Sequence, residues 1–398
     1  MSSINKIKRL FSKFKDLTML GSANLLSTAI SGIFWFYLAS LLGTTHYGEV
    51  SYFIAIAGIA STVSFLGAGT TAIVFTAKGE KILSTLFLIT IISTSIVSVI
   101  LFVLFKDFGV SLYVISYLVF GLSISDLLGR KLYRSYSKYL ISQKLLLVVF
   151  ALGFFYLIGP QGIILGYAVS FLPYFIRIYN GFKESKTNIS LIKPHFRFMM
   201  NSYVLDLSRT FSGQADKLII APMLGFSLLG NYQLGLQFIS LLGIIPNIVY
   251  QYILPHDATG ILNKKLKRAT ILVSIILAIG GIFLGPMILP HLFPKFTESM
   301  TVIRIISLAI IPLSINLIYI SKFLGEEKTR IVLIGSGIYL LIQILSIFTL
   351  GKIYSVNGVA GAYVLASTAE CVFLIIANKV LQKNHPSSQE NQTNNDKL

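Results

Sequence analysis

The chain has 398 residues, of which 55% are hydrophobic and only 12% are charged. Soluble domains carry about 25% charged residues, so this composition indicates a polytopic membrane protein. The net charge of +18 would also suit nucleic-acid binding, but the cations fall at the ends of apolar segments, which excludes it. Cys371 is the only cysteine, so no disulfide within the chain and no cysteine metal site can form. No metal and no cofactor is expected.

Twelve apolar segments approach the length of about 20 residues that a helix needs to span a bilayer. The first, 17–41, is too long for the apolar region of a signal peptide, and no A-x-A cleavage site follows it. The sequence therefore predicts an all-α polytopic protein with twelve transmembrane helices. The predicted segments are 17–41, 48–69, 82–104, 110–129, 141–158, 161–180, 202–224, 230–254, 269–289, 302–320, 331–350 and 357–380.

The positions of the basic residues predict the orientation. With a cytoplasmic N-terminus, 27 of the 33 lysines and arginines fall in cytoplasmic parts of the chain. Only Lys106, Lys295, Arg304 and Lys352 fall outside, while Arg209 and Lys217 lie within a segment. The positive-inside rule then places both termini in the cytoplasm, and the net charge is a topology signal.

An internal repeat relates the two halves of the chain. The pair Gly43 and Gly48 follows the first segment as Gly225 and Gly230 follow the seventh, 182 residues later. Similarly, the sixth and twelfth segments open on 162–170 and 358–366, each with a glycine five residues before a tyrosine. Six helices per repeat give both halves the same orientation, which predicts two six-helix bundles related by a pseudo-twofold axis along the membrane normal.

The expected domain organisation follows from this repeat. A basic cytoplasmic arm is followed by an N-terminal bundle, a cytoplasmic linker and a C-terminal bundle, and the polar tail is expected to be disordered. The expected boundaries are 1–16, 17–180, 181–201, 202–380 and 381–398.

The seventh segment carries Asp206, Arg209, Asp216 and Lys217 within otherwise apolar sequence. A charged side chain at the bilayer centre costs about 2.5–3.5 kcal/mol on insertion scales, so these residues are not expected to face lipid. On a helix all four fall within one arc of about 100°. Two compatible interpretations stay open: a structural ladder of ion pairs, and the wall of a hydrated substrate cavity.

Other segments also present polar faces. Asn24 lies on a polar face of the first segment, together with Ser27 and Thr28. A stripe on the eighth segment comprises Gln233, Gln237, Ser240, Asn247 and Gln251, and Glu370 lies in the twelfth. These residues are candidates for the same cavity, and the alternative is that such side chains hold helices together. After the fourth segment, Arg130 and Arg134 share a helical face. This face favours either an interfacial contact with anionic lipid or a landing site for a diphosphate headgroup.

Three motifs resemble polysaccharide repeat-unit flippases, the O-antigen and capsule transporters. These belong to the multidrug/oligosaccharidyl-lipid/polysaccharide exporter superfamily. The motifs are L-G-x(4)-G at 42–48, the D-K-L-I-I-A-P-M-L-G-x(4)-G run at 216–230, and the glycine-rich opening of the twelfth segment at 358–362. The resemblance covers most of the chain.

The resemblance implies a V-shaped pair of bundles around a central cavity. It implies that undecaprenyl-diphosphate-linked oligosaccharide moves from the cytoplasmic to the outer leaflet of the bacterial inner membrane by alternating access, for O-antigen (lipopolysaccharide) or capsule assembly. The expected partners are this lipid-linked oligosaccharide, membrane lipid, a polysaccharide polymerase and a chain-length regulator. A monomer is expected. The family's cavities tend to be cationic, and the two aspartates of the seventh segment depart from that pattern.

Two alternatives belong to other functional classes. A cation- or proton-coupled multidrug antiporter of the same superfamily would need acids such as Asp206 and Glu370 to titrate. A polymerase or glycosyltransferase usually needs large loops outside the membrane, and the longest loop here has about 20 residues. No nucleophile–base constellation and no ATP-binding lysine loop is found, so no enzymatic activity is expected.

Overall fold

The computed structural model describes residues 3–184, 187–258 and 263–384. Within these ranges every regular element is a helix and no strand is present. In a bilayer the backbone polar groups find no water, and a helix satisfies them within its own segment. The predicted all-α class is therefore confirmed. The last helix ends at Asn384, so the remaining part of the predicted disordered tail, 385–398, lies outside the described residues.

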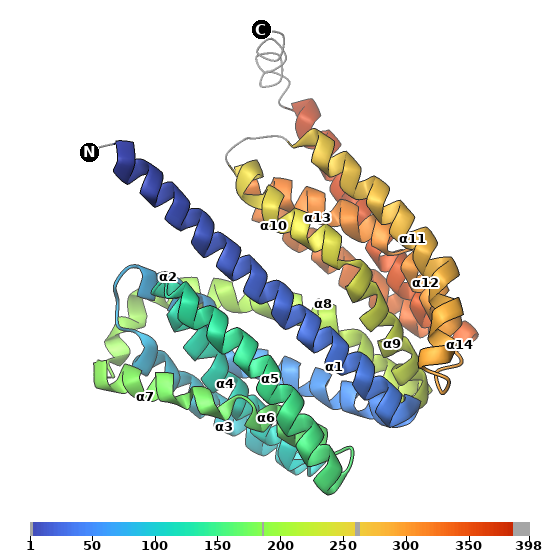
Figure 1. Cartoon of the computed structure of the whole chain (residues 1–398), viewed down its shortest axis with the longest axis horizontal. Coiled ribbons are helices and arrows are strands. Elements are labelled where there is room, and N and C mark those ends of the chain that lie inside the picture. Colours follow the sequence, from blue (N-terminus) through green and yellow to red (C-terminus); the bar gives the residue numbers. More distant parts are fainter. Residues whose placement is uncertain (1–2, 185–186, 259–262, 385–398) are drawn as a thin grey trace. The chain divides into compact units, whose positions relative to one another are not determined.

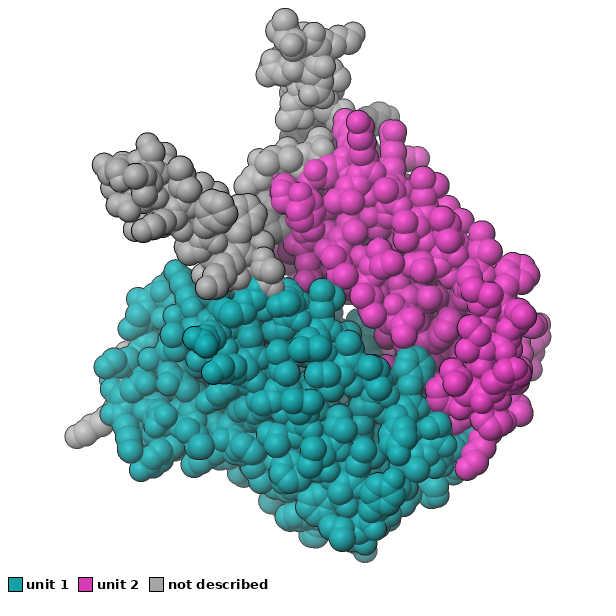
Figure 2. Space-filling view, in the orientation of Figure 1, with its two compact units in different colours: residues 1–221 teal, residues 222–398 magenta. Residues whose placement is uncertain are grey.

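The described chain divides into two compact units, residues 1–221 and 222–398 (Figure 2). The division falls inside one helix, α8, next to its internal proline Pro222. By its contacts most of α8 therefore packs with unit 1, whereas the internal repeat assigns the same segment to the second half of the chain.

Unit 1 is built around α4, which packs against α1, α2, α3, α5, α6 and α7 (Figure 1). More than half of its most apolar stretch is buried inside the structure, whereas less than a third of the corresponding stretch is buried in α1, α3 and α5. The elements of this unit are α1 (Ser3–Phe65), α2 (Ala68–Ala77), α3 (Leu83–Phe105), α4 (Phe108–Gly129), α5 (Tyr133–Ile158), α6 (Gly162–Val169), α7 (Phe175–Glu184), α8 (Phe196–Leu224) and three short 3-10 turns, Leu172–Tyr174, Ile189–Leu191 and Lys193–His195.

Unit 2 is built around α13, which packs against α10, α11 and α14 (Figure 1). Serine side chains join two of these helices in the core, where Ser274 Oγ donates a hydrogen bond to Ser314 Oγ at 2.7 Å. The helices of this unit are α9 (Phe226–Leu242), α10 (Ile244–Ala258), α11 (Lys264–Leu292), α12 (Ser299–Ser307), α13 (Ile310–Gly325) and α14 (Thr329–Asn384).

The described residues contain seven helices that are long and apolar enough to cross a membrane, and two further bent pairs. The bent pairs are α9 with α10 (49°) and α12 with α13 (42°). Two of the seven, α1 and α14, each contain a break, at Gly43 and at Ser355. Each of the twelve predicted segments lies on one of these helices or on α8. The helix α8 is missing from the apolar set, as expected from its charged residues.

The backbone repeats as the sequence motifs predict. Gly43 has φ 71° and ψ −176°, and Gly225 has φ 90° and ψ 165°. Positive φ with extended ψ is essentially restricted to glycine, so the first glycine of each L-G-x(4)-G motif lets the chain break between two helices.

The second motif pair places two helices in close contact in each unit. A Cβ atom at Gly162 would overlap the carbonyl oxygen of Phe154, and one at Gly358 would overlap that of Leu350. In both units the glycine and its partner are eight residues apart across a break at positive φ, at Gly159 and Ser355. Small residues allow this approach of backbones between membrane helices.

Candidate functional site

Two of the four charged residues of α8 form a buried ion pair. Asp216 and Lys217 are only 3% and 6% exposed, and Lys217 Nζ lies 3.3 Å from Asp216 Oδ1. The ammonium also donates a hydrogen bond to the carbonyl oxygen of Gly213, at 2.8 Å. Pairing and hydrogen bonding together offset the cost of removing both charges from water. Internal neutralisation, one of the two interpretations of the sequence, therefore applies to this half of α8.

The other two charges of α8 are placed differently. Arg209 is exposed and Asp206 is half-buried. Within the described ranges neither forms an ion pair within 4.0 Å, in contrast to Lys217. The next residue, Thr210, lies 3.0 Å from Thr62 Oγ1 through its own hydroxyl, which ties this turn of α8 to α1. The guanidinium of Arg209 is thus held on an anchored helix and has donors available for an anion.

On α1 the predicted polar face is only partly open. Asn24 is half-buried and Thr28 is exposed, but Ser27 is buried. The hydroxyls of Ser27 and Thr28 bond back to carbonyl oxygens one turn earlier, at 2.6 and 2.8 Å. This back-bonding satisfies hydroxyl groups without a partner helix. Asn24 is therefore the residue of this face with the greatest capacity to bind a ligand.

Unit 2 contains a cavity of about 280 Å³ beside Glu370. The Glu370 side chain is buried, and its Oε2 accepts a hydrogen bond from Asn316 Nδ2 at 3.0 Å. The amide oxygen of the same asparagine, Asn316 Oδ1, is buried and has no hydrogen-bond partner among the described residues. The polar residues that line the cavity are Ser240, Asn247, Ser314, Asn316, Tyr363 and Glu370.

The glutamine stripe expected on the eighth segment is divided by the bend between α9 and α10. Ser240 and Asn247 of this stripe line the unit 2 cavity, but Gln233 and Gln237 do not. Both glutamines are half-buried on α9, and Gln233 Oε1 has no hydrogen-bond partner in the described chain. The structure therefore brings Glu370 together with the far end of the stripe and leaves the two glutamines on a different part of the unit.

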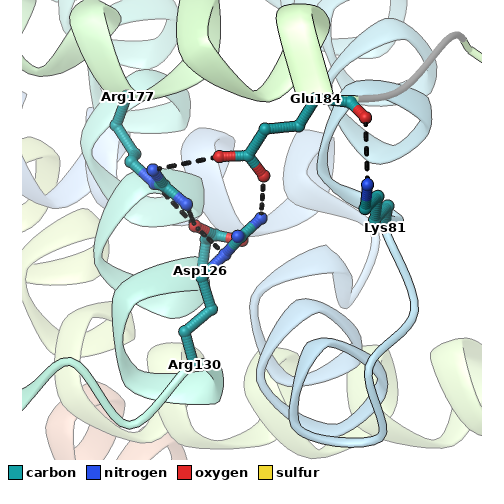
Figure 3. Close-up of polar contacts among 5 residues, drawn as sticks. All are labelled: Lys81, Asp126, Arg130, Arg177 and Glu184. Carbon is teal, nitrogen blue, oxygen red and sulfur yellow. Dashed lines mark hydrogen bonds and ion pairs between the residues drawn. The ribbon is translucent and has the colours of Figure 1, made fainter.

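Arg130 belongs to a second polar cluster, at the end of α4 (Figure 3). Its Nε donates to both carboxylate oxygens of Asp126, at 3.0 Å each, and its Nη2 lies 2.5 Å from Glu184 Oε2. Burial lowers the pKa of Arg130, but the hydrogen bonds and charges of Asp126 and Glu184 raise it above its usual value overall. Arg134 is exposed on α5 and takes no part in the ion pairs of this cluster.

Sequence reasoning missed the partners in both places. Asp126 precedes Arg130 by four residues on the same helix, a spacing that favours an ion pair and was a usable signal. Arg177 contacts the same aspartate from α7, 51 residues away, and no local pattern indicates this. Asn316 is an amide within an apolar segment, which by itself indicates a functional or packing role in a membrane helix.

Comparison with known proteins identifies structures that share this fold. No protein-family profile and no curated protein matches the chain by sequence. Among solved structures, the lipid II flippase MurJ in an inward closed conformation matches with a TM-score of 0.75 and 16% identity, over 91% of this chain and 87% of that one. An inward-facing multidrug resistance MATE family transporter of the MOP superfamily matches with 0.66 and 13%, over 91% and 96%. A MOP superfamily transporter from Pyrococcus furiosus matches with 0.58 and 15%, over 91% and 92%.

At these identities the likeness concerns the fold, and it extends over nearly the whole of each chain. The neighbours are membrane transporters, and they include both a lipid-linked flippase and multidrug transporters. The chain is therefore a multi-pass membrane protein with the all-α, two-bundle fold of the MOP-superfamily transporters.

Proposed function

We propose that this protein is a flippase for polyprenyl-diphosphate-linked oligosaccharide. It moves repeat units from the cytoplasmic to the outer leaflet of a bacterial inner membrane, by alternating access, for assembly of surface polysaccharide such as O-antigen or capsule. Both termini are cytoplasmic in this proposal. A polymerase and a chain-length regulator act on its product, and the protein works as a monomer.

The observation that carries the proposal is the exposed guanidinium of Arg209 on α8, which no carboxylate of the described residues approaches within 4.0 Å. Cation insertion into a bilayer is costly, so an arginine of a spanning helix that has no close carboxylate indicates a wet path or a ligand. Guanidinium groups bind phosphate through paired N–H donors, which suits the diphosphate of a polyprenyl carrier. The match to a lipid II flippase in fold is consistent with a lipid-linked substrate.

The other candidate residues supply neutral contacts in this proposal. Asn24 on α1 and the amides Gln233 and Gln237 on α9 can both donate and accept hydrogen bonds, as sugar hydroxyls require. The polyprenyl chain stays in lipid, because transferring it into a polar path would forfeit its hydrophobic stabilisation. The assignment of 202–380 as the second functional half, with 181–201 as the linker, follows the internal repeat.

Replacing Arg209 tests the proposal. Arg209→Ala removes an exposed cation whose acidic neighbour on the same helix, Asp206, is only half-buried, so the protein should fold and surface polysaccharide should fall at least about tenfold. Arg209→Lys keeps the charge but not the planar fork, and it should retain part of the export. Surface polysaccharide is measured at matched protein levels in the membrane. Wild-type polymer in Arg209→Ala cells would remove Arg209 from the substrate path.

The second candidate function is a cation- or proton-coupled multidrug antiporter, and the cavity at Glu370 favours it. A buried carboxylate that accepts a hydrogen bond from a neutral amide is suited to carry a proton or a cation. Under this alternative Glu370→Gln, which keeps the size of the side chain, abolishes drug efflux. Under the flippase proposal the same variant leaves drug resistance unchanged. Drug-resistance assays on wild type, Glu370→Gln and a deletion strain separate the two functions.

A further inference from the structure

Two arginines from different helices of unit 1 share two carboxylates (Figure 3). Arg130 Nε lies 3.0 Å from each Asp126 oxygen, and Arg177 Nε lies 2.6 Å from Asp126 Oδ2. On the other side, Glu184 contacts both guanidinium groups, at 2.5 Å from Arg130 Nη2 and 3.5 Å from Arg177 Nη1. The Glu184 carboxylate therefore forms one ion pair with each of the two arginines.

The two acids of the cluster differ in how firmly they are held. The Asp126 side chain is 1% exposed and lies between the two guanidinium groups, so it is a permanent counterion. The Glu184 side chain is 31% exposed and belongs to the last residue of α7. A carboxylate at a helix C-terminus meets the negative end of the helix dipole. The charge of Glu184 is therefore stabilised by the two arginines and destabilised by the dipole of its own helix.

The position of Glu184 suits an exchangeable anion. Two forked guanidinium groups aimed at one anion form the arrangement that binds phosphate most specifically. Lys81 adds a third cation, because its Nζ donates to the Glu184 backbone carbonyl at 3.3 Å. Asp126 cancels one of the two arginine charges, so removal of the Glu184 carboxylate leaves a net positive site that is partly exposed, with the Arg130 side chain 27% and the Arg177 side chain 13% exposed.

We propose that Glu184 occupies an anion site formed by Arg130 and Arg177, and that a phosphate or diphosphate group displaces it. The Glu184 carboxylate then acts as a built-in competitor that sets the affinity of the site and promotes release. The identification of the anion with the diphosphate of a lipid-linked substrate rests on the proposed function, whereas the anion site itself does not. In this arrangement Arg177, rather than Arg134, completes the headgroup site with Arg130.

Binding of inorganic pyrophosphate to the purified full-length protein tests the site. Glu184→Gln removes the competing charge and keeps the side-chain size, so it should bind pyrophosphate about tenfold more tightly than wild type. The matched control is Glu326→Gln in unit 2. Glu326 is also a half-exposed glutamate near two cations, Lys322 at 3.7 Å and Lys328 at 2.7 Å, and lies outside the arginine cluster. The control variant should bind like wild type.

Two further variants keep the test decisive if Glu184→Gln is poorly stable. Glu184→Asp keeps the charge on a shorter side chain that reaches one arginine less well, so it should bind pyrophosphate with intermediate affinity. Arg177→Ala in the Glu184→Gln background should abolish the gain. Equal pyrophosphate affinities for wild type, Glu184→Gln and Glu184→Asp, in samples with unchanged melting temperatures, would overturn the proposal. The cluster would then serve only to hold α4 and α7 together through ion pairs.

The source of the anion is distinguished by competition in vesicles. Protein reconstituted in phosphatidylcholine is titrated with pyrophosphate in the presence of either phosphatidylglycerol or undecaprenyl diphosphate. Competition by undecaprenyl diphosphate alone supports the substrate headgroup, and equal competition by phosphatidylglycerol supports a membrane lipid at the same site. The proposed function fails separately if a deletion strain still moves lipid-linked repeat units to the outer leaflet at the wild-type rate while Glu184→Gln still tightens pyrophosphate binding.

Discussion

At the residue scale, buried carboxylates of this protein fall into two kinds. Asp216, Asp126 and Asp257 each lie against a cation, and Asp257 Oδ1 is 2.7 Å from Lys267 Nζ. These pairs neutralise charge inside the bundles and are explained by packing alone. Glu370 is different, because its carboxylate accepts a hydrogen bond from the amide of Asn316 and adjoins a cavity. The contrast separates acids that hold the structure from one that is suited to a changing charge.

The pair of Asp216 and Lys217 gives a prediction at this scale. Lys217→Ala leaves a buried aspartate uncompensated and should lower the free energy of unfolding by about 3–5 kcal/mol. The double variant Asp216→Ala, Lys217→Ala removes both charges and should recover most of that loss. The melting temperatures of the wild type, Lys217→Ala, Asp216→Ala and the double variant together form the double-mutant cycle that measures this coupling.

Export by the same three variants then separates a structural role from a substrate contact. If the pair is only structural, the double variant regains export together with stability. If Lys217 contacts the diphosphate, the double variant folds but remains defective in export. A double variant that is less stable than Lys217→Ala would contradict the pairing itself.

At the scale of elements, the helices are shaped by a small number of breaks. Gly43 and Ser355 interrupt α1 and α14, and the bends before α10 and α13 divide two further spans. The breaks at Gly43 and Ser355 fall between segments that the sequence predicts as separate, whereas the bends before α10 and α13 fall inside single predicted segments, so hydropathy alone misses the bends. The glycines that permit close approach beside these breaks are the positions most sensitive to substitution.

Gly358 provides the test of this view. A Cβ at this position would overlap the backbone carbonyl of Leu350, which cannot move as a side chain can. Gly358→Ala should therefore destabilise the protein by at least about 1–3 kcal/mol, as overpacking does. Gly337→Ala on the same helix α14 is the control, since no described atom beyond the adjoining backbone of its own helix lies within 4 Å of its Cβ position. Thermal unfolding in detergent measures both, and equal melting temperatures would refute the close-contact role.

At the scale of the whole molecule, much of the fold could be predicted from the sequence. Segment positions follow from hydropathy, and the repeat follows from glycines whose conformations recur at Gly43 and Gly225. The candidate site was predictable only as a set of residue types. Arg177 meets Asp126 across 51 residues, and Asn316 meets Glu370 across 54. Such pairings depend on tertiary packing, which one sequence does not encode locally.

The central claim is that the protein carries lipid-linked oligosaccharide across the membrane. The most direct test measures where lipid-linked repeat units accumulate in a deletion strain, using labelling of the sugars in each leaflet. The account predicts accumulation in the cytoplasmic leaflet, reversed by the wild-type chain and not by Arg209→Ala. Repeat units that reach the outer leaflet at the wild-type rate in the deletion strain would contradict it.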